Sequence, residues 1–131
     1  MREMRVLVVD DSEDVRLLVK DIVEQSGHTA VAASNGREAW ELLDRGGKFS
    51  FIISDNNMPE MTGVELLQRV RADARTASIP FILMSGGRVV SDDDPTPLED
   101  VCARYSAHVM KKPFSVFSLL AMFGVGMEMT T

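Results

Sequence analysis

Five polar side chains stand at or just after short aliphatic runs of the sequence, where buried strands would end. They are three acids, a hydroxyl and an ammonium: Asp10, Asp11, Asp55, Ser85 and Lys112. Carboxylates brought together repel one another, and a hard divalent cation with oxygen ligands relieves that repulsion. A cation, a hydroxyl and an ammonium around one carboxylate would cradle the oxygens of a phosphoryl group. These residue types therefore indicate phosphoryl chemistry on a carboxylate, with Mg²⁺ as the expected ion and Mn²⁺ as its alternative.

That chemistry requires the five residues to share one edge of a sheet. Aliphatic runs alternate with helical patterns along the chain, and the expected strands are residues 5–10, 29–33, 51–54, 79–84 and 107–110. Such alternation predicts an α/β doubly wound fold, a parallel sheet covered by helices on both faces. With a strand order of 2-1-3-4-5, ligands gather beyond the carboxyl ends of the first and third strands. Those are the two strands that end in acids.

Capping residues predict where the helices begin. The expected N-cap residues are Ser12, Asn35, Thr62, Thr96 and Ser115. Thr62 with Glu65 matches a capping box, as does Asn35 with Glu38. Pro97, directly after Thr96, is typical of the first position of a helix.

The composition is that of one soluble domain. The chain has 131 residues, a net charge of −6 and 45% hydrophobic residues, and this acidic balance argues against a binder of the nucleic-acid backbone. No apolar run reaches the ~20 residues that a membrane span needs. Cys102 is the only cysteine, so no internal disulfide forms and a reducing cytoplasm is favoured. We expect a cytoplasmic protein with neither nucleic-acid nor membrane partners.

Taken singly, each of these polar residues has an ordinary structural explanation. An acid pair after a strand usually caps a helix, and a Lys-Pro pair is usually a surface turn. Their joint occurrence, in order and each at a predicted strand end, is what carries weight. The sequence resembles the receiver domain of two-component response regulators over essentially its whole length. The stretches that carry the resemblance are VLVVDDS (6–12), IISDNNMPEMTG (52–63), FILMSG (81–86) and KKPF (111–114).

The resemblance implies a flavodoxin-like (βα)5 fold and a role for each matching residue. Residues 1–131 would be a single receiver domain with a core of about 4–127. Asp55 matches the phosphoryl acceptor, and Asp10 and Asp11 match the metal-binding acids. Asn57 matches the position whose backbone carbonyl completes the metal site. Ser85 and Lys112 match the switch hydroxyl and the phosphoryl-binding lysine. The positions expected to shape the pocket are Asn56, Met58, Pro59, Gly86 and Pro113.

The function implied is that of a switch. A histidine kinase or phosphotransfer protein would transfer a phosphoryl group to Asp55 in a Mg²⁺-dependent reaction. Ser85 and Lys112 would then draw the loop after the fourth strand inward, which changes the partner-binding face of the fourth helix, fifth strand and fifth helix. The protein would be a signalling phospho-acceptor rather than an enzyme, catalysing only its own phosphoryl transfer and a slow dephosphorylation.

Two departures from the family pattern concern the readout of the switch. Val109 stands where the family usually has an aromatic ring, with His108 beside it as a candidate replacement. The loop of residues 86–97 is also longer than usual. Its acidic run, residues 92–94, is either a solvated loop or a second metal site.

The last predicted helix is apolar on every side, which is typical of a covered surface. We expect a homodimer or a downstream protein to bind there, through Val116, Phe117, Leu120 and Phe123.

Other functions on the same residues are a receiver excised from a hybrid histidine kinase or larger regulator, and an interaction module that works without phosphate. An aspartyl phosphatase would have a D-x-D arrangement after the first strand, whereas Asp10 and Asp11 are adjacent. A nucleotide-binding protein would have a glycine-rich turn there, and none is present.

Overall fold

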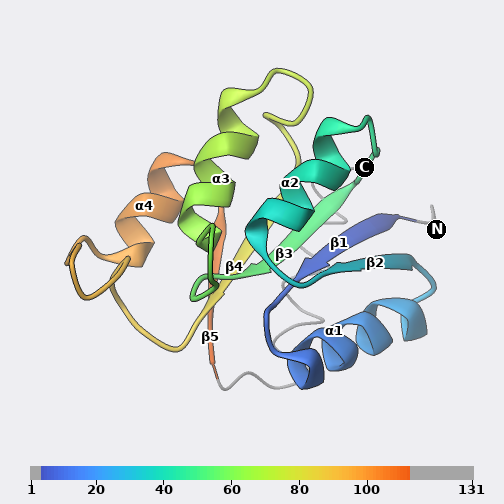
Figure 1. Cartoon of the computed structure of the whole chain (residues 1–131), viewed down its shortest axis with the longest axis horizontal. Coiled ribbons are helices and arrows are strands. Elements are labelled where there is room, and N and C mark those ends of the chain that lie inside the picture. The colour runs from blue at the N-terminus through green and yellow to red at the C-terminus, as the bar shows by residue number, and fades with distance from the viewer. Residues whose placement is uncertain (1–3, 113–131) are drawn as a thin grey trace.

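The computed structural model describes residues 4–112, and a five-stranded parallel sheet forms its centre (Figure 1). The strands are β1 (Arg5–Val9), β2 (Thr29–Ala33), β3 (Phe51–Asp55), β4 (Phe81–Ser85) and β5 (His108–Lys111). They lie in the order β2-β1-β3-β4-β5, and every neighbouring pair is parallel. The predicted α/β doubly wound fold and its strand order are confirmed.

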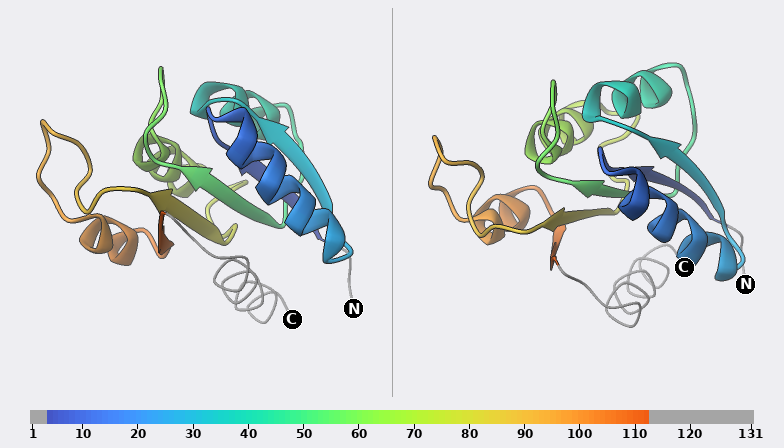
Figure 2. Two further views of the ribbon diagram at one scale, coloured as in Figure 1. Left: turned by 90° about the horizontal axis from the view of Figure 1, so that it is seen from below. Right: turned by 60° about the horizontal axis from the view of Figure 1, so that its bottom comes forward.

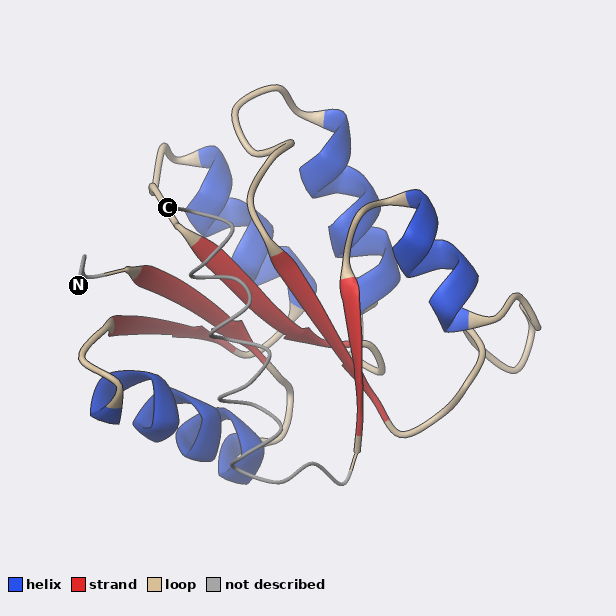
Figure 3. Ribbon diagram, turned by 180° about the vertical axis from the view of Figure 1, so that it is seen from behind, coloured by secondary structure: helices blue, strands red, loops and turns tan. Residues whose placement is uncertain are grey.

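Helices cover both faces of this sheet. Within the described range they are α1 (Glu13–Gln25), α2 (Gly36–Asp44), α3 (Gly63–Ala72) and α4 (Leu98–Arg104). Figures 1, 2 and 3 show α1 on one face and α2, α3 and α4 on the other. None of these four helices is long and apolar enough to cross a membrane. The last predicted helix, with Pro113 and the expected interface residues 116–123, lies outside the described residues.

Each strand supplies side chains to two separate cores, because successive residues of a strand point to opposite faces. In β1, Val6 and Val8 pack with α1, whereas Leu7 and Val9 pack beneath α2 and α3. β3 and β4 are buried along their whole length. This two-sided burial explains why their sequences are continuously aliphatic rather than alternating.

Three of the predicted caps are confirmed. The side chains of Ser12, Asn35 and Thr62 each accept a hydrogen bond from the backbone of the first turn that follows. Thr62 and Glu65 form the full reciprocal capping box. Glu38, by contrast, turns its carboxylate to Ser34 and not to the backbone of Asn35.

The predicted start of the fourth helix is wrong by one residue. Pro97, not Thr96, is the N-cap of α4, and it contributes no side-chain hydrogen bond. The Thr96 hydroxyl instead donates to Asp94 Oδ1 at 2.6 Å. A short polar side chain can satisfy itself within a turn as readily as at a helix end, and here the turn takes it.

The fourth and fifth strands also begin later than predicted. β4 starts at Phe81 because the Ile79 N–H donates to Thr76 in a turn and Pro80 has no N–H to give to the ladder. β5 starts at His108 because the Ala107 N–H donates to Cys102, at the end of α4.

Candidate functional site

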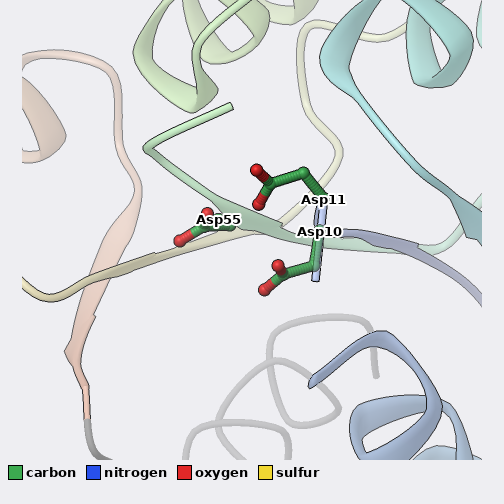
Figure 4. A group of neighbouring side chains, drawn as sticks. All are labelled: Asp10, Asp11 and Asp55. Carbon is green, nitrogen blue, oxygen red and sulfur yellow. The ribbon is translucent and has the colours of Figure 1, made fainter. Parts of the chain in front are cut away.

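The three acids predicted to act together converge at the carboxyl edge of the sheet. β1 and β3 are parallel neighbours with Val9 beside Ser54, so Asp10 and Asp55 leave the sheet next to each other. Carboxylate oxygens of Asp10, Asp11 and Asp55 all lie within 4.8 Å of one another. Figure 4 shows the three side chains gathered beyond the ends of β1 and β3, with the carboxylates of Asp10 and Asp11 turned to the side on which Asp55 lies. Asp10 and Asp55 are buried and Asp11 is exposed, which leaves the cluster open on one side.

Lys112 supplies the positive charge of the site from the other side. Its Nζ lies 2.9 Å from Asp55 Oδ1 and 3.3 Å from Asp10 Oδ2. The backbone positions it, because the Lys112 N–H donates to the Ser85 carbonyl at 2.8 Å. The lysine therefore extends the pairing of β4 with β5 by one residue and reaches across the sheet edge to both carboxylates.

Burial and neighbouring charges act on the pKa values of this pair. Burial raises the pKa of Asp55, and the carboxylates of Asp10 and Asp11 raise it further against the opposing effect of Lys112. For Lys112, burial lowers the pKa, but the hydrogen bond and charge of Asp55 and the charge of Asp10 outweigh it, so its pKa lies above the ordinary value. The ammonium thus stays charged at neutral pH and balances part of the acidic cluster.

Asp10 is fixed by the first turn of α1. Its Oδ1 accepts the Ser12 N–H at 2.9 Å, and its backbone carbonyl accepts Arg16 Nη1 at 2.8 Å. The sequence did not predict this contact of Arg16. The position of Arg16 in the first helical turn after the acid pair is the pattern that could have predicted it.

The donor set fits a hard divalent cation. Three carboxylates at one point, with one side open to solvent, are the oxygen ligands that Mg²⁺ prefers, and Mg²⁺ commonly keeps several waters. The exposed Asp11 and the buried pair beside it provide that combination.

Ser85 ends β4 beside this cluster and is buried. Its Oγ accepts the Gly87 N–H at 3.1 Å, which leaves the hydroxyl proton free to donate elsewhere. Gly86 and Gly87 follow it on the surface.

The segment after β3 turns sharply away from Asp55. The Asn56 carbonyl accepts the N–H groups of Met58 and Gly63, which closes the turn. Asn57 and Pro59 are exposed, whereas Met58 is buried in the core under α3. Gly63 is packed so tightly that a Cβ there would lie 2.3 Å from the Asp55 carbonyl oxygen.

The structure describes both features that differ from the usual pattern of the family, Val109 with His108 and the acidic run in the loop of residues 86–97. Val109 packs against the core beneath α4, and His108 points to the opposite face of β5 because neighbouring strand residues alternate. His108 therefore does not occupy the space next to Val109. The acidic run at residues 92–94 is exposed and is not among the groups of described residues able to hold a metal.

Comparison with known proteins identifies the family. The family model described as the response regulator receiver domain matches residues 6–122. The chain belongs to this family. Receiver domains are signalling domains rather than enzymes, and this receiver domain is a component of two-component signal transduction.

Among curated relatives, this receiver domain is similar to chemotaxis proteins. It is 42% identical to the chemotaxis protein CheY1 of Helicobacter pylori over 88 residues, which cover 65% of this chain and 71% of that protein. It is 39% identical to the chemotaxis protein CheY of Pseudomonas aeruginosa over 83 residues, covering 63% and 66%.

Solved structures agree with the fold of this receiver domain. The chemotaxis response regulator CheY4 of Vibrio cholerae superposes with a TM-score of 0.81 at 28% identity, covering 95% of this chain and 99% of that one. The receiver domain of a signal transduction histidine kinase from Syntrophus aciditrophicus gives a TM-score of 0.79 at 27% identity, covering 95% and 90%.

Proposed function

We propose that this receiver domain accepts a phosphoryl group on Asp55 from a histidine kinase or phosphotransfer protein, and that the modification changes which partners it binds. The observation that carries the proposal is the environment of one carboxylate. Asp55 lies beside two further acids and 2.9 Å from the Lys112 ammonium, at the carboxyl end of the sheet.

Each neighbour of Asp55 would have a separate part in the transfer. A carboxylate oxygen of Asp55 forms the new bond to phosphorus as the bond from phosphorus to the donor breaks. Lys112 stands where it would bind an oxygen of the incoming group. The Ser85 hydroxyl would donate to another of these oxygens once the group is in place.

Asp10, Asp11, Asp55 and the backbone carbonyl of Asn57 would hold Mg²⁺. When bound, the ion neutralises negative charge that builds up on the phosphoryl oxygens during transfer. Without added positive charge the three acids would repel an incoming phosphate, so we expect the reaction to require a divalent cation, with Mn²⁺ as a substitute.

Pocket shape and compartment complete the proposal. Asn56, Met58, Pro59 and Gly86 border the acceptor, and the signal would reach partners through the face that α4 and β5 share with the residues that follow them. Gly87 brings no side chain to orient an attacking water, so spontaneous dephosphorylation would be slow. The lone cysteine favours the reducing cytoplasm, where histidine kinases would meet it.

The test is incubation with Mg²⁺ and a small phosphodonor, followed by intact mass spectrometry. The wild type should gain one phosphoryl group, and Asp55→Asn should gain none. Asp14→Asn, which removes an exposed acid in the first turn of α1, is the matched control and should gain it normally. Omission of the cation should abolish the gain.

A phosphoryl group that survives Asp55→Asn would contradict the assignment of the acceptor. No gain in the wild type would favour an interaction module that works without phosphate. The joint presence of the carboxylates, Ser85 and Lys112 favours the phosphoryl acceptor over that module.

A further inference from the structure

The long segment between β4 and α4 is folded on itself. Residues 88–97 are called here the β4–α4 hairpin, and its two arms pair through an antiparallel bridge between Val89 and Pro97. The Val90 N–H donates to the Thr96 carbonyl across the arms (2.9 Å). At the base of the hairpin, the N–H of Leu98, the first residue of α4, donates to the Arg88 carbonyl (2.8 Å). Ser91 and Asp94 exchange backbone hydrogen bonds at the tip. These internal bonds join the two arms into one unit.

The connection of the hairpin to β4 is loose. Gly86 and Gly87 are exposed, and a Cβ on either would meet nothing closer than Ser85 Oγ, at 4.0 Å. The Gly87 N–H nevertheless donates to that same Oγ. A movement of the Ser85 side chain therefore pulls directly on the base of the hairpin.

A single side chain ties the hairpin to β3. Asn56 is buried, with 1% of its surface exposed, and both ends of its amide are used. Its Oδ1 accepts the Val64 N–H at 3.2 Å, at the start of α3, and its Nδ2 donates to the Val90 carbonyl at 3.0 Å. Among hydrogen bonds between residues 4–112, this last one is what joins the arms of the hairpin to the residue directly after β3.

We propose that Asn56 is a positioning residue that couples the state of Asp55 to the β4–α4 hairpin. The inference rests on the proposed function, because it takes Asp55 and Ser85 to be the groups that respond to a phosphoryl group. Asn56 follows Asp55 directly in the chain, and the Gly87 N–H donates a hydrogen bond to the Ser85 hydroxyl oxygen. The hairpin is thus held at one point by the acceptor strand and at another by the switch hydroxyl, and a change in their separation rotates it.

Rotation of the hairpin would be visible at the surface beside β5. A hollow of about 400 Å³ lies between the hairpin, the start of α4 and the end of β5. Val89, Leu98 and Val109 give it apolar walls, and Arg88 and Lys111 also line it. Because the hairpin forms one wall, its position sets the shape of this hollow. Val109 lines the hollow at the position where receiver domains usually have an aromatic ring. Without a ring to change its orientation, the hairpin would transmit the switch instead.

The test is hydrogen exchange at the amides of Val90 and Leu98, which donate the two bonds that hold the arms together. Asn56→Ala should speed exchange at both by about five-fold, the factor that corresponds to about 1 kcal/mol for one lost hydrogen bond. Asn56→Asp keeps an acceptor for the Val64 N–H but loses the donor to Val90, and should have the same effect on the hairpin. Asn35→Ala is the matched control, because it removes an amide that caps α2 far from the hairpin.

The second measurement repeats the exchange with Asp55 loaded by beryllofluoride and Mg²⁺, a mimic of the phosphorylated aspartate. In the wild type and in Asn35→Ala, loading should change exchange at Val90 and Leu98 by at least about three-fold, less than the effect of losing the whole bond. In both Asn56 variants the change should disappear when exchange is compared at equal occupancy of Asp55 by beryllofluoride, which fluorine NMR of the bound mimic measures in every sample.

Two results would overturn the coupling. One is a loading response that persists in both Asn56 variants, and the other is a wild-type hairpin that does not respond although Asp55 is phosphorylated. If the wild type is never phosphorylated, the proposed function fails and the coupling fails with it. The faster exchange of the unloaded Asn56 variants would then still report the tie between Asn56 and Val90.

Discussion

At the scale of single residues, Lys112 carries the electrostatic balance of the site. Its ammonium is the cation within hydrogen-bonding distance of both Asp55 and Asp10 in the described part of the chain, and both carboxylates are buried. Removing it leaves buried like charges without compensation, which is the costly way to break an ion pair. A bound divalent cation would supply the missing charge.

Lys112→Met should therefore lower the free energy of unfolding of the metal-free protein by about 2 kcal/mol. Mg²⁺ should restore more stability to this variant than it gives to the wild type. Urea titrations with and without Mg²⁺ measure both effects. Lys111→Met is the control, since Lys111 is exposed and its loss should change stability by less than about 0.5 kcal/mol. An equal response of the two variants to Mg²⁺ would show that Lys112 does not balance the acids.

At the scale of elements, Arg71 joins α3 to the loops at the amino ends of β4 and β5. Its guanidinium donates to four backbone carbonyls, those of Ala77, Ile79, Tyr105 and Ser106, at 2.6 to 3.2 Å. Burial lowers the pKa of Arg71, but its ordinary value is so high that it remains charged. Only the planar fork of an arginine reaches so many acceptors at once.

Arg71→Lys should lower the free energy of unfolding by about 2 kcal/mol, because an ammonium leaves several of these carbonyls unpaired. Thermal and urea unfolding give the value. Arg69→Lys makes the same chemical change two residues earlier on α3, where the guanidinium lies over the Trp40 ring at 5.6 Å, and should cost less than about 1 kcal/mol. Similar losses in the two variants would mean that the carbonyl contacts contribute little.

These elements also show what sequence patterns could and could not predict. The alternation of strands and helices and three helix caps follow from local patterns. The convergence of Asp10, Asp11 and Asp55 follows from the rule that parallel strands end at one edge, once the strand order implied by the resemblance to receiver domains is adopted. The tie between Asn56 and Val90 spans 34 residues. Nothing local distinguishes Asn56 from the exposed Asn57 beside it. Arg71 likewise matches an ordinary basic residue near the end of a helix, because its carbonyl partners come from distant loops.

At the scale of the whole molecule, Cys102 reports on global unfolding. The thiol lies on the buried face of α4, within the core, and burial raises its pKa from 9.0 to about 11. A thiol that is both covered and protonated does not react, because the thiolate is the nucleophile. Its alkylation at pH 8 should therefore proceed only through unfolded molecules.

Alkylation of Cys102, followed by intact mass, should be at least about a hundred-fold slower in the native protein than in urea-unfolded protein at pH 8. The same raised pKa fixes the sign of a pH effect. The folded state holds the thiol proton more tightly, so this contribution to stability is complete below pH 9 and is lost as the pH rises toward about 11. Unfolding titrations at pH 8 and 10.5, compared with Cys102→Ala, isolate that loss. Rapid labelling of the native protein at pH 8 would contradict the burial of the thiol.

The reach of Lys112 to Asp10 has a consequence for how the protein is made. The two residues are 102 positions apart. The acids of the site follow β1 or end β3, whereas Lys112 directly follows β5. A chain still being synthesised, or one in which β5 has not yet joined the sheet, has acids but no ammonium to bind a phosphoryl group. On the proposed function, competence to receive a signal would therefore be acquired last, as a property of the completed sheet. Nascent and partly unfolded copies would remain silent in the pathway even where they outnumber finished ones.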